Sequence, residues 1–327
     1  MIERQNLGVS VMPLETRLDT ILYLGKKADE LGYNQFALPE TWSYDMTSLM
    51  AALAVQTEQI SLSTGILGMW GRSPATVAMA AATINMLSNG RFELGIGAST
   101  PQIAEGLHDV PYSKPYSKLR QTLTQIRALL NGERVPIEDV DGIRPLKLNL
   151  PPQPDIPIFL AATSPKSIQL AGELADGWLP FLITRDKLGE MAAILQASAK
   201  AAGRTQPIGV FPAMPTIVAP THEEARAGAA WFVAFYIVMM GDMYRTSLMR
   251  QGYEAEVTAV LQANEGRKPA IVPPAAEVLL EQLTIFGTPD EVPAQMAKWV
   301  EAGATRPGML LLPNLTNEQI DFTLAAF

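Results

Sequence analysis

The sequence predicts a (β/α)8 barrel with insertions, and three observations support that fold class. Short apolar, β-rich runs alternate with longer segments of helical periodicity, roughly eight times along the chain. The runs are apolar throughout, which is typical of parallel strands covered by helices. The 327 residues suit a barrel of about 250 residues with added loops. We therefore expect a single barrel domain over residues 1–327, with insertions near residues 100–150 and 231–274.

The first half of the chain contains the first group of expected strands, which are residues 7–13, 35–40, 60–67 and 91–97. The helices between them show apolar residues at helical spacing and are expected at residues 14–31, 47–57 and 74–87. Gly32 follows the first helix as a C-terminal cap, and Ser73 before Pro74 fits an N-cap followed by proline at the first helical position. Residues 100–150 are irregular except for a helix expected at residues 118–130.

The second half continues the alternation, with strands expected at residues 156–161, 177–182, 208–218 and 308–313. Prolines in the third of these strands indicate a bend or a sheet edge. Helices are expected at residues 165–175 and 185–202, and residues 231–274 are expected to be a mostly helical insertion. Thr221 with Glu224, and Thr288 with Glu291, have the spacing of capping boxes.

Composition excludes several classes of protein. Hydrophobic residues make up 48% of the chain and charged residues 18%, which excludes a disordered chain and a coiled coil. The net charge of -8, without any basic run, argues against nucleic-acid partners and anionic membranes. There are no cysteines and only two histidines, so disulfides, thiolate chemistry and a multi-histidine metal centre are excluded.

The N-terminal residues MIERQNLGVSVMP lack the charged-then-apolar pattern of a secretory signal. The longest apolar run, residues 229–240, is shorter than the roughly 18 to 20 residues that span a bilayer. We therefore expect a cytoplasmic protein.

GIGAST, which starts at Gly95, is the first candidate for a binding motif. A dinucleotide fingerprint would need a third glycine where Thr100 stands, and it would follow the first strand rather than the fourth. A nicotinamide site is therefore disfavoured, and a tight turn at a strand end is the structural alternative. In a barrel, this turn lies at the carboxyl ends of the strands, where active sites are built.

The segment LAATSPKSIQLAGELADGWLP, residues 160–180, is the second candidate. A strand there ends in small residues and a helix begins at Pro165, so free backbone N–H groups and the helix dipole favour an anion. Thr163 and Ser164 add hydroxyl donors, and small side chains let a phosphate approach the backbone. The alternative is that Ser164 serves only as an N-cap.

Other side chains near predicted strand ends could take part in binding or catalysis. Trp70 and Arg72 could line the binding site of a planar ligand, or they could belong to a surface loop. Glu40 ends the second strand and Glu105 follows GIGAST, so either could act as general acid or base. A solvated loop charge is the alternative for Glu105. His108 could titrate near neutrality in the same loop.

The apolar stripe WFVAFYIVMM, residues 231–240, is expected to be core or a dimer interface rather than a cofactor site. A stripe of this kind on a helix favours packing against a partner, so we expect a homodimer. His222 lies in a capping box and is expected to be structural.

Several motifs together resemble the bacterial luciferase-like family of flavin- and deazaflavin-dependent oxidoreductases. They are STGIL, LSNGRFELGIGAS, LAGELADGW and FGTPDEVPAQMAKWVEAGA, and the likeness extends from about residue 7 to residue 313. The resemblance implies a (β/α)8 barrel with insertions that is often dimeric. It also implies a planar cofactor at the carboxyl ends of the strands, with its phosphate near the helix after the fifth strand.

GILGMWGRSPATVAMAAATI and STPQIAEGLHDVPYSKP are most similar to the branch that uses the deazaflavin coenzyme F420, to which the methylenetetrahydromethanopterin reductases belong. The resemblance implies a bulge with a non-proline cis peptide around residues 65–67, which supports the back of the cofactor ring. It also implies a glutamate near the reaction centre, for which Glu105 is the approximate match. Members that oxidise alcohols carry an acidic residue followed by histidine after the second strand, whereas this chain has Glu40 and Thr41. The resemblance therefore favours hydride delivery to an unsaturated acceptor.

The function implied by the resemblance is hydride transfer between coenzyme F420 and an unidentified small organic substrate. The alternatives are a two-component monooxygenase that uses reduced FMN and oxygen, and a catalytically silent flavoprotein of the same fold. The implied proton donor is Glu40 or Glu105. The residues implied to bind the cofactor are Thr64, Gly65, Ile66 and Leu67 behind the ring, Gly97, Ala98 and Ser99 on the opposite wall, and Ala162, Thr163, Ser164, Gly177 and Trp178 around the phosphate and tail.

Overall fold

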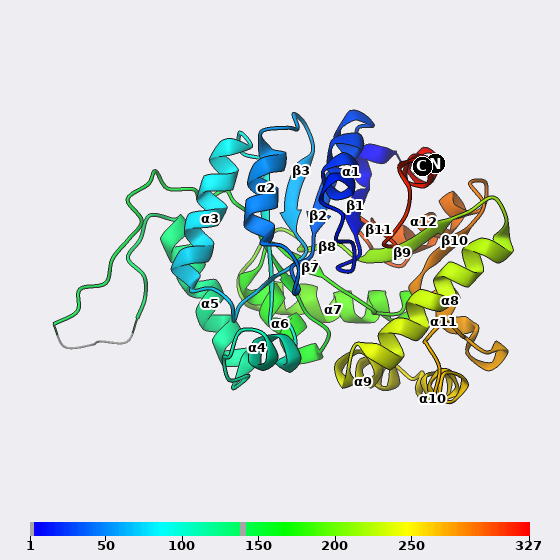
Figure 1. The fold of residues 1–327 in the computed structure, drawn as a ribbon. Coiled ribbons are helices and arrows are strands. Elements are labelled where there is room, and N and C mark those ends of the chain that lie inside the picture. The colour runs from blue at the N-terminus through cyan, green and yellow to red at the C-terminus, as the bar shows by residue number, and fades with distance from the viewer. Residues whose placement is uncertain (1–2, 138–141) are drawn as a thin grey trace.

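A parallel sheet forms the centre of the molecule, as the sequence predicts. The computed structural model describes residues 3–137 and 142–327, and within them eleven strands pair into one sheet with parallel ladders. The sheet curves, and helices surround it (Figure 1). The strands are β1 Gly8–Val11, β2 Gln35–Leu38, β3 Ser61–Thr64, β4 Leu67–Gly68, β5 Phe92–Gly97, β6 Ile158–Ala161, β7 Gly177–Leu179, β8 Gly209–Val210, β9 Ala213–Val218, β10 Ile285–Gly287 and β11 Gly308–Leu311.

The strand order explains how the sheet closes. Its path is β10-β9-β11-β1-β2-β3-β5-β6-β7-β8, so β8 lies at one end and β9 lies near the other. Only Phe211 and Pro212 separate these two strands in the chain, and therefore the bent segment joins both sides of the sheet. The bend that the prolines predict within residues 208–218 is confirmed, and with it the predicted (β/α)8 barrel. The strand β10 pairs with β9 outside the ring.

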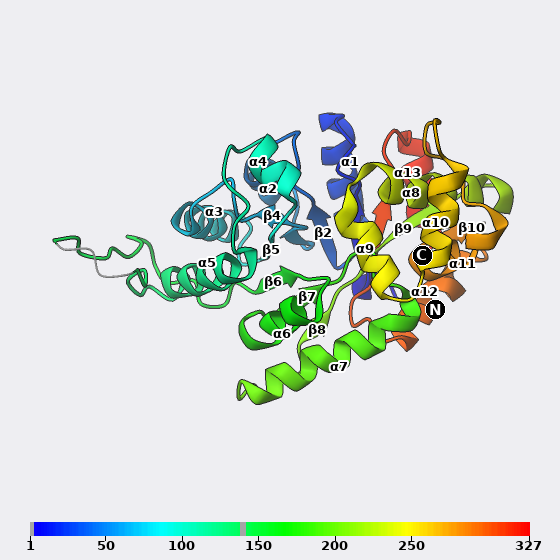
Figure 2. The same ribbon diagram turned by 90° about the horizontal axis from the view of Figure 1, so that it is seen from below.

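The helices fall into two groups (Figures 1 and 2). One group accompanies the strands from β1 to β8 and from β10 to the end of the chain, and consists of α1 Leu18–Glu30, α2 Met46–Ala54, α3 Pro74–Leu87, α4 Pro101–Gly106, α5 Pro115–Leu130, α6 Pro165–Leu174, α7 Arg185–Ala201, α12 Val292–Glu301 and α13 Asn317–Ala325. The other group lies between β9 and β10 in the chain and consists of α8 His222–Met239, α9 Asp242–Arg250, α10 Glu254–Ala263 and α11 Val278–Leu283. In space, α8 packs on β9 and β10, which α13 and α12 also contact.

Local hydrogen bonds set several helix starts. The side chains of Ser73, Ser164 and Thr221 accept backbone N–H groups at the starts of α3, α6 and α8. The predicted N-caps at Ser73 and Ser164 are confirmed, and of the capping box predicted at Thr221 and Glu224 only the threonine half is formed. The first helix begins at Leu18 and not at residue 14. The reason is that the Glu15 carboxylate accepts the backbone N–H of Arg17 at 2.8 Å and holds a turn before the helix.

The predicted capping box at Thr288 is only half formed. The Glu291 carboxylate accepts the Thr288 N–H at 2.8 Å, but the helix itself begins at Val292 without a side-chain cap. His222 Nδ1 lies 3.1 Å from the same Glu291 carboxylate, which agrees with a structural role for this histidine.

A buried ion pair lies at the amino ends of the strands. The guanidinium of Arg306, just before β11, donates to both carboxylate oxygens of Glu93 on β5, at 2.9 and 2.8 Å. It also lies 4.4 Å from the centre of the Phe211 ring. These side chains fill the end of the barrel opposite to the predicted site, which leaves the carboxyl ends of the strands for binding.

The apolar stripe at residues 231–240 packs mainly within the chain. Phe232, Val233, Tyr236 and Ile237 of α8 are buried in one cluster with Met12 from the end of β1, among other residues. The homodimer stays a prediction, but most of the surface that suggested it is core. No single described helix is long and apolar enough to cross a membrane; α8 and α9 pass that test only as a pair, and the pair is bent by 108°.

Candidate functional site

The third strand breaks next to β5, where the family resemblance implies a bulge. The Thr64 hydroxyl donates to the carbonyl oxygen of Gly95 at 2.7 Å and accepts the N–H of the same residue at 2.9 Å. The next peptide bond, between Gly65 and Ile66, is cis, and β4 then resumes pairing with β5. The predicted non-proline cis peptide within residues 65–67 is therefore confirmed.

Two glycines of β5 let the bulge approach closely. A Cβ atom on Gly95 would lie 1.8 Å from the Thr64 carbonyl oxygen, which is impossible without moving the backbone. A Cβ atom on Gly97 would lie 3.0 Å from the Ile66 side chain and 3.2 Å from Ala161 of β6. The motif GIGAST thus provides close packing between the bulge and two strands, as a tight turn at a strand end would.

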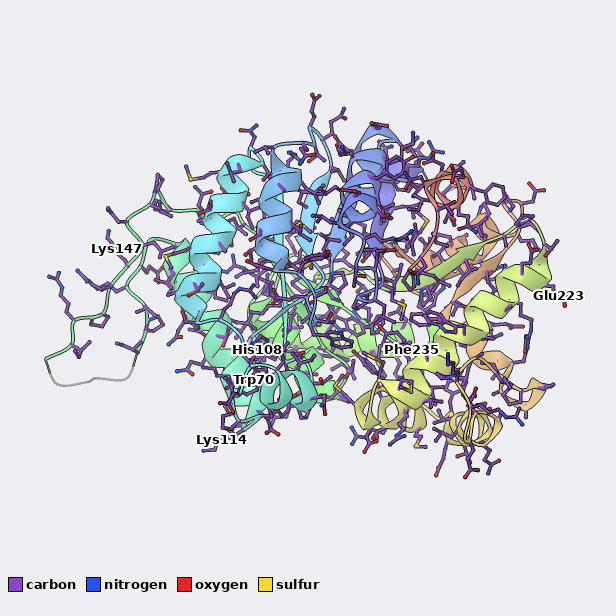
Figure 3. All side chains as sticks on the ribbon, viewed as in Figure 1. Trp70, His108, Lys114, Lys147, Glu223 and Phe235 are labelled. Atoms are coloured by element: carbon purple, nitrogen blue, oxygen red, sulfur yellow. The ribbon has the colours of Figure 1, made fainter. Side chains whose placement is uncertain are left out.

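Two loops pack together beyond β4 and β5. The indole N–H of Trp70 donates to the Ala98 carbonyl oxygen at 2.7 Å, and its ring centre lies 5.1 Å from that of Tyr112. The His108 ring lies against Gly71, and Figure 3 shows Trp70 and His108 as neighbours. Ser99 has a φ of 54°, which is an uncommon conformation for a residue with a side chain. Trp70 therefore ties the bulge to the loop at Ala98 and Ser99.

Glu40 lies beside the bulge and is held by Arg72. Its backbone N–H donates to the Ile66 carbonyl oxygen at 3.2 Å, and its carboxylate pairs with Arg72, which also pairs with Asp45 at 2.7 Å. Burial lowers the pKa of Arg72, but the two carboxylates outweigh burial and raise it above its usual value. This guanidinium therefore bridges the loops that follow β2 and β4.

Thr41 follows Glu40 and was not among the predicted site residues. Its hydroxyl oxygen is buried and has no hydrogen-bond partner within the described residues. A buried polar atom without a partner is uncommon in proteins. The sequence carried no signal for this, because a threonine after a strand is ordinary.

Glu105 lies apart from this arrangement. It is exposed near the end of α4, and its carboxylate accepts the backbone N–H of Tyr112 at 2.9 Å. The structure therefore gives it a loop-capping contact and does not pair it with Glu40.

The start of α6 has the features of an anion site. The Ser164 hydroxyl caps the helix by accepting the Ser167 N–H at 3.3 Å, and the Ser167 hydroxyl accepts the Ser164 N–H in return. Within the described ranges, the backbone N–H groups of Thr163 and Lys166 carry no hydrogen bond. These two N–H groups and the helix dipole point to an anion at this place.

Two predicted cofactor residues lie elsewhere. Trp178 is fully buried and donates its indole N–H to the Ala162 carbonyl oxygen at 2.8 Å, so it supports the turn before α6 from within the core. Gly177 is the first residue of β7, against the rings of Phe159 and Phe211, at the opposite end of the strand from that turn.

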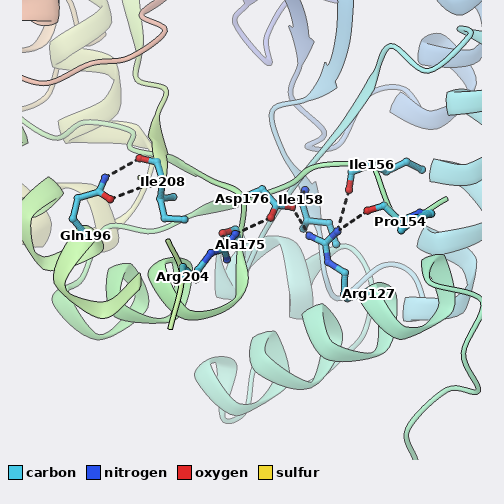
Figure 4. Close-up of polar contacts among 9 residues, drawn as sticks. All are labelled: Arg127, Pro154, Ile156, Ile158, Ala175, Asp176, Gln196, Arg204 and Ile208. Atoms are coloured by element: carbon cyan, nitrogen blue, oxygen red, sulfur yellow. Dashed lines mark hydrogen bonds and ion pairs between the residues drawn. The ribbon is translucent and has the colours of Figure 1, made fainter. Parts of the chain in front are cut away.

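Asp176, the residue before Gly177, fixes the amino end of β7. Asp176 pairs with Arg127 and Arg204 and accepts the Ile158 N–H at 2.9 Å (Figure 4). These contacts connect α5, β6 and the end of α7 at the amino end of β7. The sequence places Gly177 close to the turn at Ser164, but the helix between them returns the chain to the other end of the sheet.

A cavity of about 320 Å³ lies between the loops after β1 and β2. Its lining includes Leu14, Trp42 and Tyr44, and the Trp42 side chain is half exposed. Trp42, in its lining, is two residues beyond Glu40 in the chain. Neither aromatic residue was singled out from the sequence.

These residues fit a planar ligand that carries a phosphate. The bulge presents Ile66, and the free N–H groups at α6 suit an anion. Thr163, Ser164 and Lys166 would hold the phosphate, and Thr64 to Leu67 would lie behind a ring. The parallel barrel and the loops at the carboxyl ends of its strands define a barrel protein whose candidate site lies at that end.

The chain belongs to the luciferase-like monooxygenase family, whose family model matches residues 4–306. It is 30% identical over 304 residues to a protein of Mycobacterium tuberculosis that is named only provisionally as a coenzyme F420-dependent oxidoreductase, covering 85% of this chain and 86% of that one. It is 28% identical over 308 residues to the 5,10-methylenetetrahydromethanopterin reductase of Archaeoglobus fulgidus, covering 91% of each.

A solved structure gives the same picture of the fold. The coenzyme F420-dependent tetrahydromethanopterin reductase of Methanopyrus kandleri superimposes with a TM-score of 0.78 at 21% identity, over 98% of this chain and 96% of that one. The predicted luciferase-like family and its barrel fold are thus confirmed.

Proposed function

We propose that this protein is an oxidoreductase that transfers a hydride between coenzyme F420 and a small organic substrate. The observation that carries the proposal is the bulge at Gly65 and Ile66 in a chain that also offers free N–H groups at the start of α6. The similarity to F420-dependent proteins supports the choice of coenzyme. The deazaflavin supplies a carbon centre that exchanges a hydride and reacts poorly with oxygen.

The protein's own part is to orient two molecules and to exclude water. Ile66 and the Thr64–Gly95 contact fix the surface behind the ring. Thr163 and Lys166 anchor the phosphate, while Ala98 and Ser99, held by Trp70, line the opposite wall.

The two predicted proton donors have different surroundings. Glu40 forms an ion pair with Arg72, and Glu105 is exposed and bonded to the Tyr112 N–H. Each of the two carboxylates is therefore already bonded to another group of the protein. Either residue as proton donor stays a prediction, and the corresponding Glu→Gln variant should lower kcat with little effect on the affinity for the coenzyme.

A fluorescence titration with coenzyme F420 and with FMN tests the choice of cofactor. We expect tighter binding of F420, followed by anaerobic turnover of an acceptor with an activated C=C or C=N bond. Preferential binding of FMN, or turnover that requires oxygen, would contradict the proposal and favour the two-component monooxygenase.

A further inference from the structure

Two neighbouring helices on the outside of the barrel carry no charged side chain. They are α2 and α3, which pack side by side (Figure 1), whereas every other described α-helix has at least one Asp, Glu, Lys or Arg. A helix on the surface of a globular protein normally turns charged and polar residues toward water. The outward faces of α2 and α3 therefore differ in composition from the rest of the helical shell.

The outward face of α3 is apolar and exposed. The side chains of Met79 and Met86 are 47% and 52% exposed, and Leu87 at the end of the helix is also exposed. The two methionines are seven residues apart, so they lie on one side of the helix. Thr83 lies between them on that side, and its hydroxyl donates to the Met79 carbonyl oxygen at 2.9 Å. Because this hydroxyl is satisfied within the helix, the face can lose its water at little cost.

The neighbouring α2 adds small side chains and another exposed apolar residue. Ala51 and Ala52 are partly exposed, and Val55, which follows the helix, is exposed. Alanine side chains allow another helix to approach closely. Before α2, the Asp45 carboxylate is paired with Arg72, so the charge at the edge of this face is compensated within the chain.

The segment after α5 extends the same side of the molecule. Residues 133–137 and 142–150 leave the body of the protein beside α3 and α5 (Figures 1 and 2). The backbone N–H of Val135 donates to the Leu146 carbonyl oxygen at 2.9 Å, so the two parts of the segment are joined there. The side chains of Ile143 and Leu146 are exposed. Apolar surface on this side of the protein therefore continues beyond the two helices.

A second copy of the chain fits this face better than a charged partner or a membrane. The centres of protein interfaces are depleted of charged residues and enriched in methionine, as is the outward face of α3. Two chains of net charge -8 repel each other, and a neutral contact face keeps their like charges out of the interface. Helices that lie on membranes carry Lys and Arg on their polar side, and α2 and α3 have neither.

The size of the face suits the centre of a dimer interface. The 14 residues of α3 and the 9 residues of α2 make helices about 21 Å and 14 Å long. At a width of about 10 Å each, their outward faces cover roughly 350 Å². A stable interface buries about 800 Å² on each partner, and its apolar centre is surrounded by a polar rim. The surroundings of the two helices, with Ile143 and Leu146, supply that remainder.

We infer that α2 and α3 form the contact face of a homodimer, in which the same two helices of a second copy pack on them about a two-fold axis. A two-fold contact uses the same patch on both copies, and a patch without charges is compatible with itself. This interface lies on the other side of the molecule from α8, whose apolar stripe is mostly core (Figures 1 and 2). The inference does not depend on the coenzyme or on the proposed function.

Light scattering of charge variants is the first test. Met79→Glu and Met86→Glu each place a carboxylate on α3, and a two-fold interface receives that charge twice. We expect a dimer of the unmodified protein at micromolar concentration and a dissociation constant raised at least about a hundredfold in each variant. Circular dichroism should show the same helix content, because both side chains are half exposed. Met239→Glu, at an exposed methionine of α8, is the matched control and should remain a dimer.

Three outcomes of these measurements overturn the inference. The first is a monomer mass for the unmodified protein. The second is a dimer that Met239→Glu dissociates and the α3 variants leave intact, because the interface would then lie on α8. The third is binding of the unmodified protein to phosphatidylcholine vesicles that Met79→Glu abolishes, which would assign the face to a membrane surface.

A distance measurement locates the interface without placing a charge in it. The chain has no cysteine, so Gln56→Cys after α2 and Gln262→Cys on α10 each provide one site for a spin label. Both positions are exposed, and Gln56 lies at the edge of the proposed contact face. Pulsed electron paramagnetic resonance should give a shorter distance between the two labels of a dimer at Gln56 than at Gln262. An equal or longer distance at Gln56 overturns the inference.

Discussion

The Thr64 side chain and the Gly95 backbone satisfy each other by two hydrogen bonds, one in each direction. The hydroxyl oxygen lies 2.7 Å from the carbonyl oxygen and 2.9 Å from the amide nitrogen of Gly95. The side chain therefore takes the place of a neighbouring strand where β3 turns away from β5. This exchange allows the chain to form a bulge inside a buried sheet without leaving polar groups unpaired.

Gly95→Ala should prevent the bulge from forming. Its Cβ atom would lie 1.8 Å from the Thr64 carbonyl oxygen, so we expect a loss of more than about 4 kcal/mol of unfolding free energy, or no folded protein. Urea unfolding measures the change. Gly68→Ala is the control on the same bulge, because its Cβ would meet Ser99 at an ordinary 3.6 Å, and a similar loss there would contradict the steric explanation.

Thr64→Val should destabilise the protein by about 1 to 3 kcal/mol, because it leaves the buried N–H and C=O of Gly95 without partners. Thr64→Ser keeps the hydroxyl and should recover most of that loss. Equal stability of the valine and serine variants in urea would show that the two hydrogen bonds are not what supports the bulge.

Ser164→Asp should weaken cofactor binding by at least about tenfold, because it places a negative charge against the phosphate at the start of α6. Aspartate is a good N-cap, so the helix should remain intact. Ser164→Asn provides a cap without the charge and should bind nearly as well as the unmodified protein. Unchanged affinity in the aspartate variant, by fluorescence titration, would move the phosphate to another place.

Arg306→Met should lower the unfolding free energy by about 3 to 5 kcal/mol, because it leaves the Glu93 carboxylate buried without its cation. Adding Glu93→Gln to that variant should recover part of the loss, since the uncompensated charge is then removed. Arg267→Met, at an exposed position, is the control. Additive losses in the double variant would contradict a direct ion-pair effect.

Stability should depend on Glu15 in mild acid. Burial acts to raise the pKa of Glu15, but hydrogen bonds from Arg17 and Asn314 outweigh it, and the pKa lies below its usual value. The contribution of a carboxylate with a lowered pKa is present above its unfolded pKa and is lost as the pH falls through its folded pKa. Glu15→Gln should therefore lose stability at pH 7 and show a smaller further decrease toward pH 4.

Urea unfolding at several pH values measures this difference. Glu301→Gln changes an exposed carboxylate and should leave the pH dependence as it is. The same pH dependence in Glu15→Gln as in the unmodified protein would assign the acid sensitivity to other groups.

Light scattering tests the predicted homodimer. At micromolar concentration it should give about twice the chain mass if a partner covers the surface that α8 leaves open, where the Met239 side chain is 60% exposed. The mass of a monomer would contradict the dimer and would mean that the apolar residues 231–240 pack only within their own chain.

Features that depend on neighbours along the chain could be read from the sequence. The alternation of apolar runs and helical segments predicted the parallel barrel, and the caps at Ser73 and Ser164 follow from residues two or three positions apart. The resemblance to a family indicated the bulge at Gly65 and Ile66, and the family itself.

Tertiary structure decided which of the candidates meet. Gly177 and Ser164 are close in sequence, but they lie at opposite ends of the barrel because a helix carries the chain back between them. Trp178 has the side chain of a ligand-binding residue, yet strand register directs it into the core. The apolar stripe at residues 231–240 could have faced a partner, and only the packing of α8 against residues near the ends of β1, β7 and β11 shows that most of it is core. Periodicity and capping are local and therefore written in the sequence, whereas depth along the barrel and contact between distant elements arise only when the sheet closes.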